Sequence, residues 1–433
     1  MSAESEPNVA PSRLSRDEIE ANFADLHPPL SRSEALIEAD RCYFCYDAPC
    51  TIACPTGIDI PGFIQKIRSD NMRGSAQTIL RENIMGGMCA RVCPTEVLCE
   101  EACVRNTHEE KPVEIGLLQR YATDPVIDAN TQLFARAPSS GKKIAVVGGG
   151  PAGLSCAHRL AVLGHEVVIF NRDDKPGGLN EYGIAAYKTV DDFAQIEVNY
   201  ILSVGGIEVR HKVTLGEDVQ LSELVSDFDA VFLGIGLGQS NDLGIDGEDK
   251  SGVINAIDYI AELRQAEDKS QMPIGKTVVV IGGGMTAIDI AVQSRHLGAQ
   301  QVHMVYRRGP EKMSASMFEQ ALAHTSGVTI HHRAPPKRLL GDDHVTGVEY
   351  ETDCGKFVLY ADMVFKAIGQ QMEGIGELDT KNGRLVVDDG RRTSHEKVWA
   401  GGDCVVGGDD LTVSAVQHGK VAAIDIDRHL REQ

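Results

Sequence analysis

The sequence predicts an α/β protein made of a cysteine-rich helical segment followed by two similar βαβ units. Three observations support this fold class. Eight of the eleven cysteines lie before residue 104, in two groups separated by a segment with helical periodicity. A glycine-rich turn follows a short apolar run twice, at Gly148 and at Gly282. A strand and an alanine-rich helix near the C-terminus complete the first unit, so we expect the second unit as an insertion in the first.

The two cysteine groups have the spacing of iron-sulfur ligands. The first reads C-x2-C-x4-C-x3-C from Cys42 to Cys54, and the second reads C-x3-C-x5-C-x3-C from Cys89 to Cys103. Bacterial ferredoxin runs end in Cys-Pro, and Pro55 follows Cys54 here. Structural zinc is the alternative, because C-x2-C is frequent in zinc sites, although zinc usually takes two close ligand pairs in one small module. Clusters together with two nucleotide turns indicate a redox enzyme.

The N-terminus and the charge limit the compartment and the partners. The start MSAESEPNVAPSRLSRDE has no basic segment followed by an apolar one, so we expect no secretory signal and a cytoplasmic protein with reduced thiols. No apolar run approaches the length that spans a bilayer, so we expect no membrane partner. The formal net charge of -21 repels phosphate backbones, which disfavours nucleic acid as a partner.

Residues 1–138 are predicted to form a helical domain around the metal centres. Residues 1–30 are polar and lack periodicity, so we expect an extended or wrapping arm. Ser31–Glu34 is a capping box that begins a helix leading to Cys42, and Ile60–Leu80 has helical periodicity. Large apolar side chains are scarce in this domain, so bound clusters are expected to contribute much of its stability.

The first βαβ unit follows a linker, Ala135–Gly141, whose small, polar and Pro/Gly composition is typical of a domain boundary. Lys143–Val147 is predicted to be a buried parallel strand, and Val167–Phe170 the next one. The fingerprint Gly148–Gly153 lies between them. Its glycines permit a tight turn, close approach of a pyrophosphate, and close packing, while the helix N-terminus supplies amide donors.

The same pattern occurs a second time. Lys142–Gly164 reappears with the same internal spacing as Lys276–Gly298. Each copy is followed by a strand that ends in glycines, at 229–236 and at 362–369. The sequence therefore predicts two nucleotide-binding domains, although one copy could have lost its ligand, because a single motif match is weak evidence.

The two copies differ where the ribose is recognised. The acid that usually binds the ribose hydroxyls is replaced by Asn171 in the first copy, which can still form a hydrogen bond but lacks the charge. The second copy reads Val305-Tyr306-Arg307-Arg308, which offers two guanidinium groups and no acid. These arginines favour a 2'-phosphate, as in NADP, or they stack on adenine or bind the pyrophosphate of NAD.

The C-terminal segment is expected to complete the first nucleotide domain. Val398–Ala400 is a strand followed by Asp403 at a turn, and Thr412 begins a helix. In a flavoprotein these two residues can contact the ribityl chain and the flavin ring. The predicted boundaries are 1–138 for the helical iron-sulfur domain, 139–270 for the N-terminal portion of a discontinuous FAD-binding domain, 271–370 for an NAD(P)H-binding domain, and 371–433 for the C-terminal portion of the FAD-binding domain.

These motifs together resemble the dihydropyrimidine dehydrogenase family. The residues that carry the resemblance are Asp47-Ala48-Pro49-Cys50, Cys54-Pro55-Thr56, Asp59-Ile60, Cys93-Pro94-Thr95, the Cys99-x3-Cys103 spacing, and Ile115-Gly116-Leu117-Leu118-Gln119. With the two nucleotide motifs, the similarity to the N-terminal half of that enzyme covers nearly the whole chain. The small subunit of glutamate synthase is similar more distantly.

The resemblance implies a set of cluster ligands. One 4Fe-4S cluster would bind Cys42, Cys45, Cys50 and Cys103, and the other would bind Cys54, Cys93, Cys99 and the amide oxygen of Gln119. Cys89 would then be a non-ligand. Such crossing of ligands between two groups occurs in ferredoxin-type runs. Glutamate synthase carries a glutamate at the place of Gln119, so this residue favours the pyrimidine enzyme.

The resemblance also implies the nucleotide contacts. FAD would contact Val92, Gly148, Gly149, Gly150, Pro151, Ala152, Gly153, Asn171, Gly177, Gly178, Leu179, Lys188, Gly402, Asp403 and Thr412. The nicotinamide cofactor would contact Gly283, Gly284, Met285, Thr286, Arg307, Arg308, Ala367, Ile368 and Gly369. Asn171, Met285 and Ser314 depart from the family pattern. Because NADP-using animal relatives have an arginine at the place of Ser314, we expect NAD(H), with NADP(H) as the alternative.

The implied function is that of an electron-input subunit. Electrons would pass from NAD(P)H through FAD and two 4Fe-4S clusters to a separate FMN- and iron-sulfur-containing subunit resembling PreA, which reduces uracil or thymine to 5,6-dihydropyrimidines. Because the cofactors carry the chemistry, no catalytic side chain is expected. The alternatives are an NADPH oxidoreductase like the glutamate synthase small subunit and, in a different class, a non-enzymatic zinc-binding scaffold.

Overall fold

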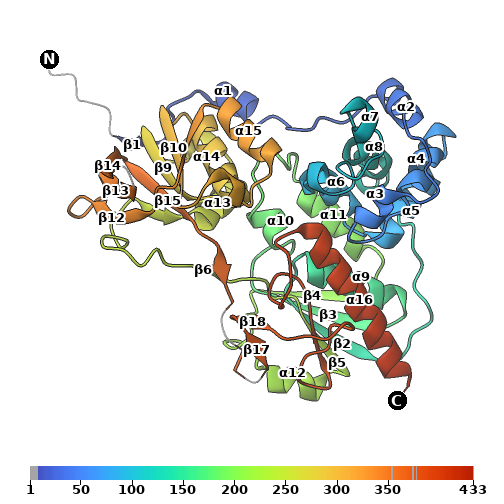
Figure 1. The fold of residues 1–433 in the computed structure, drawn as a ribbon. Coiled ribbons are helices and arrows are strands. Elements are labelled where there is room, and N and C mark those ends of the chain that lie inside the picture. The colour runs from blue at the N-terminus through green and yellow to red at the C-terminus, as the bar shows by residue number, and fades with distance from the viewer. Residues whose placement is uncertain (1–7, 353–354, 373–374, 377, 433) are drawn as a thin grey trace. The chain divides into compact units, whose positions relative to one another are not determined.

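The structure is a computed structural model that describes residues 8–352, 355–372, 375–376 and 378–432. The chain divides into two compact units, and neither is continuous in sequence (Figure 1). Unit 1 comprises Met1–Leu26, Tyr182–Val190 and Gln239–Gln371, and unit 2 comprises His27–Glu181, Asp191–Gly238 and Met372–Gln433. None of the described helices is both long enough and apolar enough to cross a lipid bilayer.

Unit 2 is built on a five-stranded parallel sheet with the order β19-β5-β2-β3-β4. Its strands are β2 (Lys143–Val147), β3 (Glu166–Asn171), β4 (Ile207–His211), β5 (Ala230–Leu233) and β19 (Val398–Ala400). The residues of β2, β3 and β5 are buried in almost unbroken runs, as expected for central strands of a parallel sheet. The strands expected at 143–147, 167–170 and 398–400 are thereby confirmed.

Five helices and a short hairpin accompany this sheet. They are α9 (Pro151–Val162), α10 (Leu179–Tyr182), α11 (Phe193–Leu202), α12 (Leu221–Asp227), α16 (Thr412–Arg431), and the pair β17 (Thr380–Lys381) and β18 (Arg384–Leu385). Helix α16 lies along α9 (Figure 1). A Cβ atom on Gly419 would collide with the carbonyl oxygen of Ala152, so this close crossing requires glycine.

The helical part of unit 2 precedes the sheet. Its elements are α2 (Arg32–Asp40), α3 (Pro49–Ala53), α4 (Ile60–Arg68), α5 (Met72–Glu82), α6 (Gly86–Val92), the 3-10 turn η1 (Thr95–Val97), α7 (Asn106–Glu109) and α8 (Ile115–Asp128). The periodic segment 60–80 forms two helices, because Asp70 takes a left-handed conformation with φ +58° between them. Phe63 and several isoleucines are fully buried beside the cysteines, so this part has a larger apolar core than expected.

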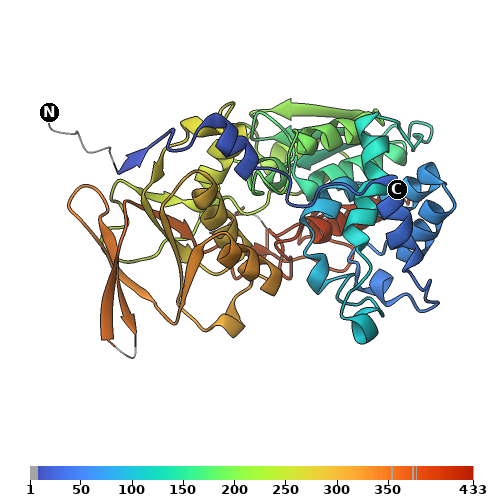
Figure 2. The same ribbon diagram turned by 90° about the horizontal axis from the view of Figure 1, so that it is seen from above.

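Unit 1 contains a second five-stranded parallel sheet, in the order β11-β10-β9-β15-β7. Its strands are β7 (Val253–Asn255), β9 (Thr277–Gly282), β10 (Gln301–Tyr306), β11 (Val328–His332) and β15 (Met363–Ala367), with helices α13 (Ala256–Gln265), α14 (Met285–His296) and α15 (Met317–Thr325). Figure 2 shows an antiparallel ribbon of β12 (Pro336–Leu340), β13 (Gly347–Thr352) and β14 (Gly355–Tyr360) beside this sheet, in orange. Small elements complete the unit: β6 (Gln239–Ser240) paired with β16 (Gln370–Gln371), η2 (Lys269–Gln271) and η3 (Pro310–Lys312).

The two sheets have corresponding strands, which locates the insertion. In both, the strand of the glycine turn is central, the next two strands follow on one side, and the glycine-ending strand lies on the other. The fifth strand is β19 in unit 2, but it is β7 in unit 1, where it precedes the glycine turn in sequence and pairs with β15. The expected boundary at 270/271 is therefore too late, and the insertion begins at Gln239.

The N-terminal arm also differs from the expectation. Strand β1 (Val9–Ala10) pairs with β8 (Ile274–Gly275), and Ser15 and Glu18 form a capping box for α1 (Arg16–Asn22). Ile19 and Phe23 are buried in the core of unit 1. Residues 8–26 of the arm are thus ordered and belong to unit 1, so the boundary 1–138 of the helical domain is wrong at its N-terminal end.

Candidate cofactor-binding sites

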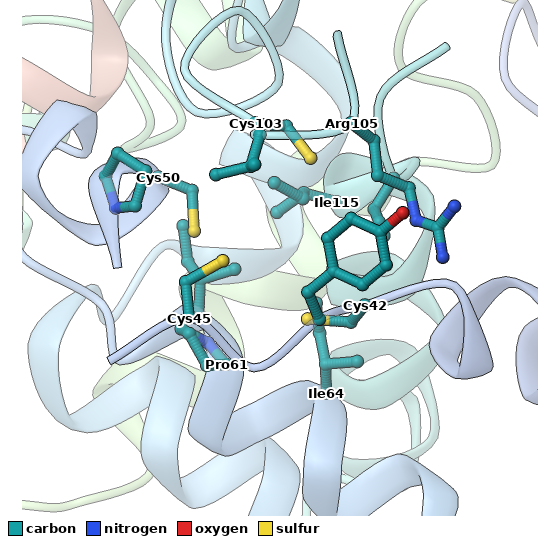
Figure 3. A pocket seen from close by; sticks show the side chains of 13 residues that line it. Cys42, Cys45, Cys50, Pro61, Ile64, Cys103, Arg105 and Ile115 are labelled. Carbon is teal, nitrogen blue, oxygen red and sulfur yellow. The ribbon is translucent and has the colours of Figure 1, made fainter. Parts of the chain in front are cut away.

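Four cysteines from two distant segments line one pocket. Cys42, Cys45, Cys50 and Cys103 surround it, and Figure 3 shows their sulfur atoms directed toward a common space. The remaining wall is mainly apolar, with Ile60, Pro61 and Ile64 from α4, Ile115 from α8, and Val113 just before α8. These are the four cysteines expected to hold the first cluster. Burial raises the pKa of Cys50 to about 12, and since metal binds the thiolate, a bound metal centre must displace these protons.

The second group of cysteines gathers around Cys93, at the C-terminal end of α6. Cys89, Cys99 and Cys54 all interact with Cys93, and together with burial they raise the pKa of its thiol well above the usual value. Cys54 comes from the first sequence group and Cys99 from the second, so the sulfur atoms cross between the groups as expected. Cys89 lies one helical turn before Cys93 and is buried in the protein core.

A zinc site and a 4Fe-4S cluster differ in the space that they need between the sulfur atoms. Among the described residues, no group of three or more His, Cys, Asp or Glu side chains is close enough to hold one metal ion. A zinc ion would bring four sulfur atoms within about 2.3 Å of one centre. A 4Fe-4S cluster instead binds each cysteine through a different iron, which suits sulfur atoms that surround a wider space.

The side-chain amide of Gln119 is held at the start of α6. Its side-chain nitrogen donates to the carbonyl oxygen of Gly86 at 2.7 Å, across the contact between α8 and α6. A carbonyl oxygen can only accept, so the nitrogen must face Gly86 and the amide oxygen takes no part in this bond. A glutamate at this position could not form this bond when ionised.

The glycine turn of unit 2 has the form of a pyrophosphate cradle. Gly148 has φ +97° in the turn after β2, and a Cβ atom there would collide with Gly234. Helix α9 begins at Pro151 after Gly150 with no side-chain cap, so its first amide groups are available to an anion. A Cβ atom on Gly150 would lie 3.8 Å from Gly178, and Gly177 donates to the carbonyl of Gly149, so the segment before Leu179 lies against the turn.

Asn171 braces the glycine turn from the end of β3. Its side-chain oxygen accepts the amide hydrogen of Gly149 at 3.1 Å, and its nitrogen donates to the carbonyl oxygens of Asp173 and Lys175 at 2.7 and 3.1 Å. Both donors of the buried amide are therefore used by the backbone. A ribose hydroxyl could still donate to the remaining lone pair of the oxygen.

Two elements from the C-terminal segment complete this site. Gly402 takes φ +93° after β19, and burial, with Asp410 nearby, raises the pKa of Asp403 to about 6. The hydroxyl of Thr412, at the start of α16, donates to the side chain of Asn180 at 2.7 Å. Val92 ends α6 and packs against the core of the same unit. Unit 2 therefore assembles every residue expected to contact FAD except Lys188.

Lys188 belongs to unit 1 and has its own partners there. Its ammonium lies 2.7 Å from Asp289 and 2.6 Å from Glu319, and all three side chains are buried. Burial opposes its charge, but the two carboxylates raise the pKa of Lys188 above its usual value. Sequence patterns do not reveal this cluster, because no local pattern joins residues so far apart. The contact of Lys188 with FAD stays a prediction.

The glycine turn of unit 1 is built in the same way. Helix α14 begins at Met285 after Gly284 without a side-chain cap, with Thr286 in its first turn. The ring of Tyr306, at the end of β10, occupies the space where Gly283 would carry a side chain. Gly282 lies against the carbonyl of Ala367, the last residue of β15, and Ile368 and Gly369 follow.

The groups expected to choose between NAD and NADP are accessible. Arg307 and Arg308 are exposed immediately after β10. The hydroxyl of Ser314 would lie 3.1 Å from a Cβ atom on Gly284, so this residue faces the turn. An arginine there could reach the same turn, whereas serine brings no charge.

Comparison with known families agrees with this arrangement. Residues 142–419 match the pyridine nucleotide-disulphide oxidoreductase family, and residues 19–131 match domain II of dihydropyrimidine dehydrogenase, described as a 4Fe-4S cluster domain. The chain thus belongs to the pyridine nucleotide-disulphide oxidoreductases, as a member with an N-terminal iron-sulfur domain. It binds FAD, a nicotinamide dinucleotide and 4Fe-4S clusters.

Two relatives match nearly the whole chain. A homologue of the NAD-dependent dihydropyrimidine dehydrogenase subunit PreT from Salmonella typhi is 32% identical over 414 residues, covering 95% of this chain and 98% of the relative. The small chain of the NADPH glutamate synthase of Escherichia coli K12 is 34% identical over 440 residues, covering 93% and 92%. The chain is therefore an NAD(P)H-dependent oxidoreductase that transfers electrons.

A solved structure supports the fold of the nucleotide domains. The thioredoxin reductase of T. acidophilum has a TM-score of 0.55 and 21% identity, covering 66% of this chain and 99% of its own. At this identity the likeness concerns the fold alone. It agrees with the expected fold class, in which nucleotide domains follow a helical iron-sulfur domain.

Proposed function

We propose that this chain is the electron-input subunit of a dihydropyrimidine dehydrogenase. Gln119 carries the proposal. Its amide is held by the carbonyl of Gly86 with the oxygen available to a cluster, and this residue type separates the pyrimidine enzyme from glutamate synthase, which has a glutamate there. The extent of the match with PreT supports the proposal, since it covers 98% of that relative.

Each cofactor has candidate residues of suitable chemistry. The ligands of the clusters would be Cys42, Cys45, Cys50 and Cys103 for one, and Cys54, Cys93, Cys99 and Gln119 for the other. The first turns of α9 and α14 would bind the pyrophosphates of FAD and NAD(H) with backbone amides and the positive end of the helix. Bound FAD would supply the exchange between hydride transfer and single-electron transfer.

The protein's own role in this chemistry is positioning. Asn171 and Tyr306 fix the middle glycines of the two turns, and Gln119 is aimed by one hydrogen bond. No described side chain is required as a general base. We propose NAD(H) as the physiological nucleotide, since Ser314 offers no positive charge to a 2'-phosphate.

The proposed partner is an FMN- and iron-sulfur-containing subunit resembling PreA. The test is to co-express both chains and measure NADH oxidation that depends on uracil or thymine. The chain alone should reduce an artificial dye with NADH but should not reduce uracil. Uracil reduction by the chain without a partner, or no uracil-dependent oxidation in the complex, would contradict the proposal.

The second candidate is a glutamate synthase small subunit, and the sequence identity of 34% to the Escherichia coli chain favours it. Substrate-dependent oxidation of NADH or NADPH by the complex distinguishes the two candidate functions. A complex with the large chain of glutamate synthase would oxidise NADPH only in the presence of glutamine and 2-oxoglutarate. Comparing kcat/KM for NADH and NADPH in each complex tests the nucleotide preference at the same time.

A further inference from the structure

Large apolar side chains are exposed around the first cysteine pocket. Ile37, Tyr43, Tyr46 and Ile52 are 67%, 53%, 106% and 79% exposed, and they lie within one short segment of unit 2. Tyr43, Tyr46 and Ile52 are within two residues of Cys42, Cys45 and Cys50, the pocket cysteines from this segment. We call these three side chains the tyrosine patch. A surface that binds nothing rarely concentrates such side chains, because each exposes apolar area to water.

The patch is held in place by the cysteine segment itself. The guanidinium of Arg105 lies 4.1 Å from the centre of the Tyr43 ring, and Arg105 follows the pocket cysteine Cys103 by two residues. The Tyr43 hydroxyl donates to Glu109 at 3.5 Å. Ile52 is on α3, the helix that also carries Cys50. The patch therefore has a fixed relation to the sulfur atoms of the pocket.

The arginines near the tyrosine patch form ion pairs, but two carboxylates near it do not. Arg41 pairs with Glu38 at 2.5 Å, Arg68 pairs with Asp40 at 2.5 Å, and Arg105 pairs with Glu109. Among the described residues, the exposed carboxylates Asp47 and Asp59 have no ion-pair partner. A protein that docks here therefore meets an apolar centre with uncompensated negative charge beside it.

We propose that the tyrosine patch is the docking surface for the electron-accepting subunit, whose contact face is apolar with a basic rim. This inference rests on the proposed role as an electron-input subunit. Electrons leave a metal centre most readily where little protein separates it from the acceptor, and the patch is made by sequence neighbours of three expected ligands. Tyrosine is also one of the side-chain types enriched among the residues that anchor protein interfaces.

Other occupants fit the charges less well. In a symmetric contact between two copies of this chain, the same patch would meet itself, and Asp47 and Asp59 would face like charges without compensation. An anionic lipid surface would repel the same carboxylates. A partner with Lys or Arg around an apolar face satisfies both features.

The test compares two double variants in the full chain. Tyr46→Ser with Ile52→Ser removes the exposed side chains that do not line the pocket. Tyr360→Ser with Ile424→Ser is the matched control, because these side chains are 76% and 53% exposed elsewhere. Both variants should keep the wild-type iron content and dye reduction by NADH. The patch variant should weaken the complex at least tenfold, which corresponds to about 1.4 kcal/mol, while the control should stay within twofold of wild type.

The binding partner in this test is whichever of two subunits forms a complex with the wild-type chain: the FMN subunit resembling PreA or the glutamate synthase large chain. If the complex does not reduce uracil, the proposed function fails, yet the affinities still decide the docking surface. An unchanged affinity of the patch variant overturns the docking proposal. Failure of both subunits to bind overturns it too, as does a wild-type homodimer in sedimentation that the patch variant abolishes.

Discussion

At the scale of single residues, the backbone of each glycine turn is fixed by one side chain at the end of the next strand. Asn171 does this in unit 2 by accepting the amide hydrogen of Gly149, while its nitrogen donates to the carbonyl oxygens of Asp173 and Lys175. Tyr306 does it in unit 1 with its ring. The sequence analysis treated Asn171 as a weakened ribose ligand, because the family has an acid there. The structure adds a role in bracing the turn that only an amide can fill.

This role predicts that restoring the family's acid is harmful. Asn171→Asp should lower the free energy of unfolding by about 2–3 kcal/mol, because a buried carboxylate would replace the donor that two carbonyl oxygens now share. FAD affinity should fall as the turn loosens. Denaturant unfolding at a fixed FAD concentration measures the loss, with exposed Asn130→Asp as the control. A gain in FAD affinity would show that the missing acid matters more than the brace.

The ligand assignment makes a second prediction for single residues. Cys89→Ser should keep the full iron content, about eight atoms per chain for two 4Fe-4S clusters, because Cys89 is expected to be a buried non-ligand. Gln119→Leu should lose or alter one cluster, since leucine has no oxygen to offer. Iron and labile sulfide analysis, with electron paramagnetic resonance of the reduced protein, separates the two variants. The opposite pattern would exchange the roles of Cys89 and Gln119.

At the scale of elements, α6 lies beside residues that are expected at the metal site and at the flavin site of unit 2. The carbonyl oxygen of Gly86, its first residue, accepts the hydrogen bond from Gln119. The helix ends at Val92, and Cys93 follows directly. It packs against α8, α11 and α16. Glu197 on α11 accepts the amide hydrogens of Gly87 and Met88 at 2.8 and 3.1 Å. A fully buried carboxyl therefore fixes the start of the helix on which both sites depend.

Burial raises the pKa of Glu197 to about 8, although the two amides and Arg91 oppose the shift. The folded protein then retains a proton that the unfolded chain releases near pH 4.5, so this contribution to stability is present below pH 4.5 and is lost as pH rises toward 8. Glu197→Gln keeps an oxygen for both amides and removes the titration. Relative to wild type, the variant should gain at least about 2 kcal/mol in unfolding free energy between pH 5 and pH 8.

Denaturant unfolding at several pH values measures this gain. Glu217→Gln, at an exposed carboxylate, is the control and should follow wild type. A constant difference between Glu197→Gln and wild type at all pH values would mean that Glu197 is ionised in the folded protein throughout this range.

Sequence patterns predicted elements well where the signal is local. The βαβ units, the capping box at Ser31 and the C-terminal helix follow from periodicity and glycine spacing within one segment. The box Ser15-x-x-Glu18 has the same local signal, but the polar composition around it favoured an extended arm. The role of Glu197 could not be predicted from the sequence, because its partners lie more than a hundred residues away in sequence and become neighbours only through packing.

At the scale of the whole molecule, the errors in the predicted boundaries have one physical cause. Strand β7 and the N-terminal arm both complete unit 1, yet both precede its glycine turn in sequence. Composition and linkers reveal where a chain is flexible, but they do not reveal which sheet a short strand will join. The place of Cys103 in the cysteine pocket was predictable only through family resemblance, since spacing alone groups Cys42, Cys45 and Cys50 with Cys54.

The placement of the arm makes the last prediction. Phe23 is 6% exposed in the core of unit 1 and contacts the ring of His296 edge-on at 5.4 Å between centres. Phe23→Ala should lower the stability of unit 1 by about 3 kcal/mol through the cavity it leaves, and NADH binding should weaken while the iron content stays at the wild-type level.

Phe63→Ala, in the core beside the cysteines, is the matched variant and should lower the iron content first. Since both variants remove the same ring from a buried site, only the unit that each ring supports distinguishes them. Loss of iron in Phe23→Ala with normal NADH binding would show that the arm stabilises the iron-sulfur domain and not unit 1.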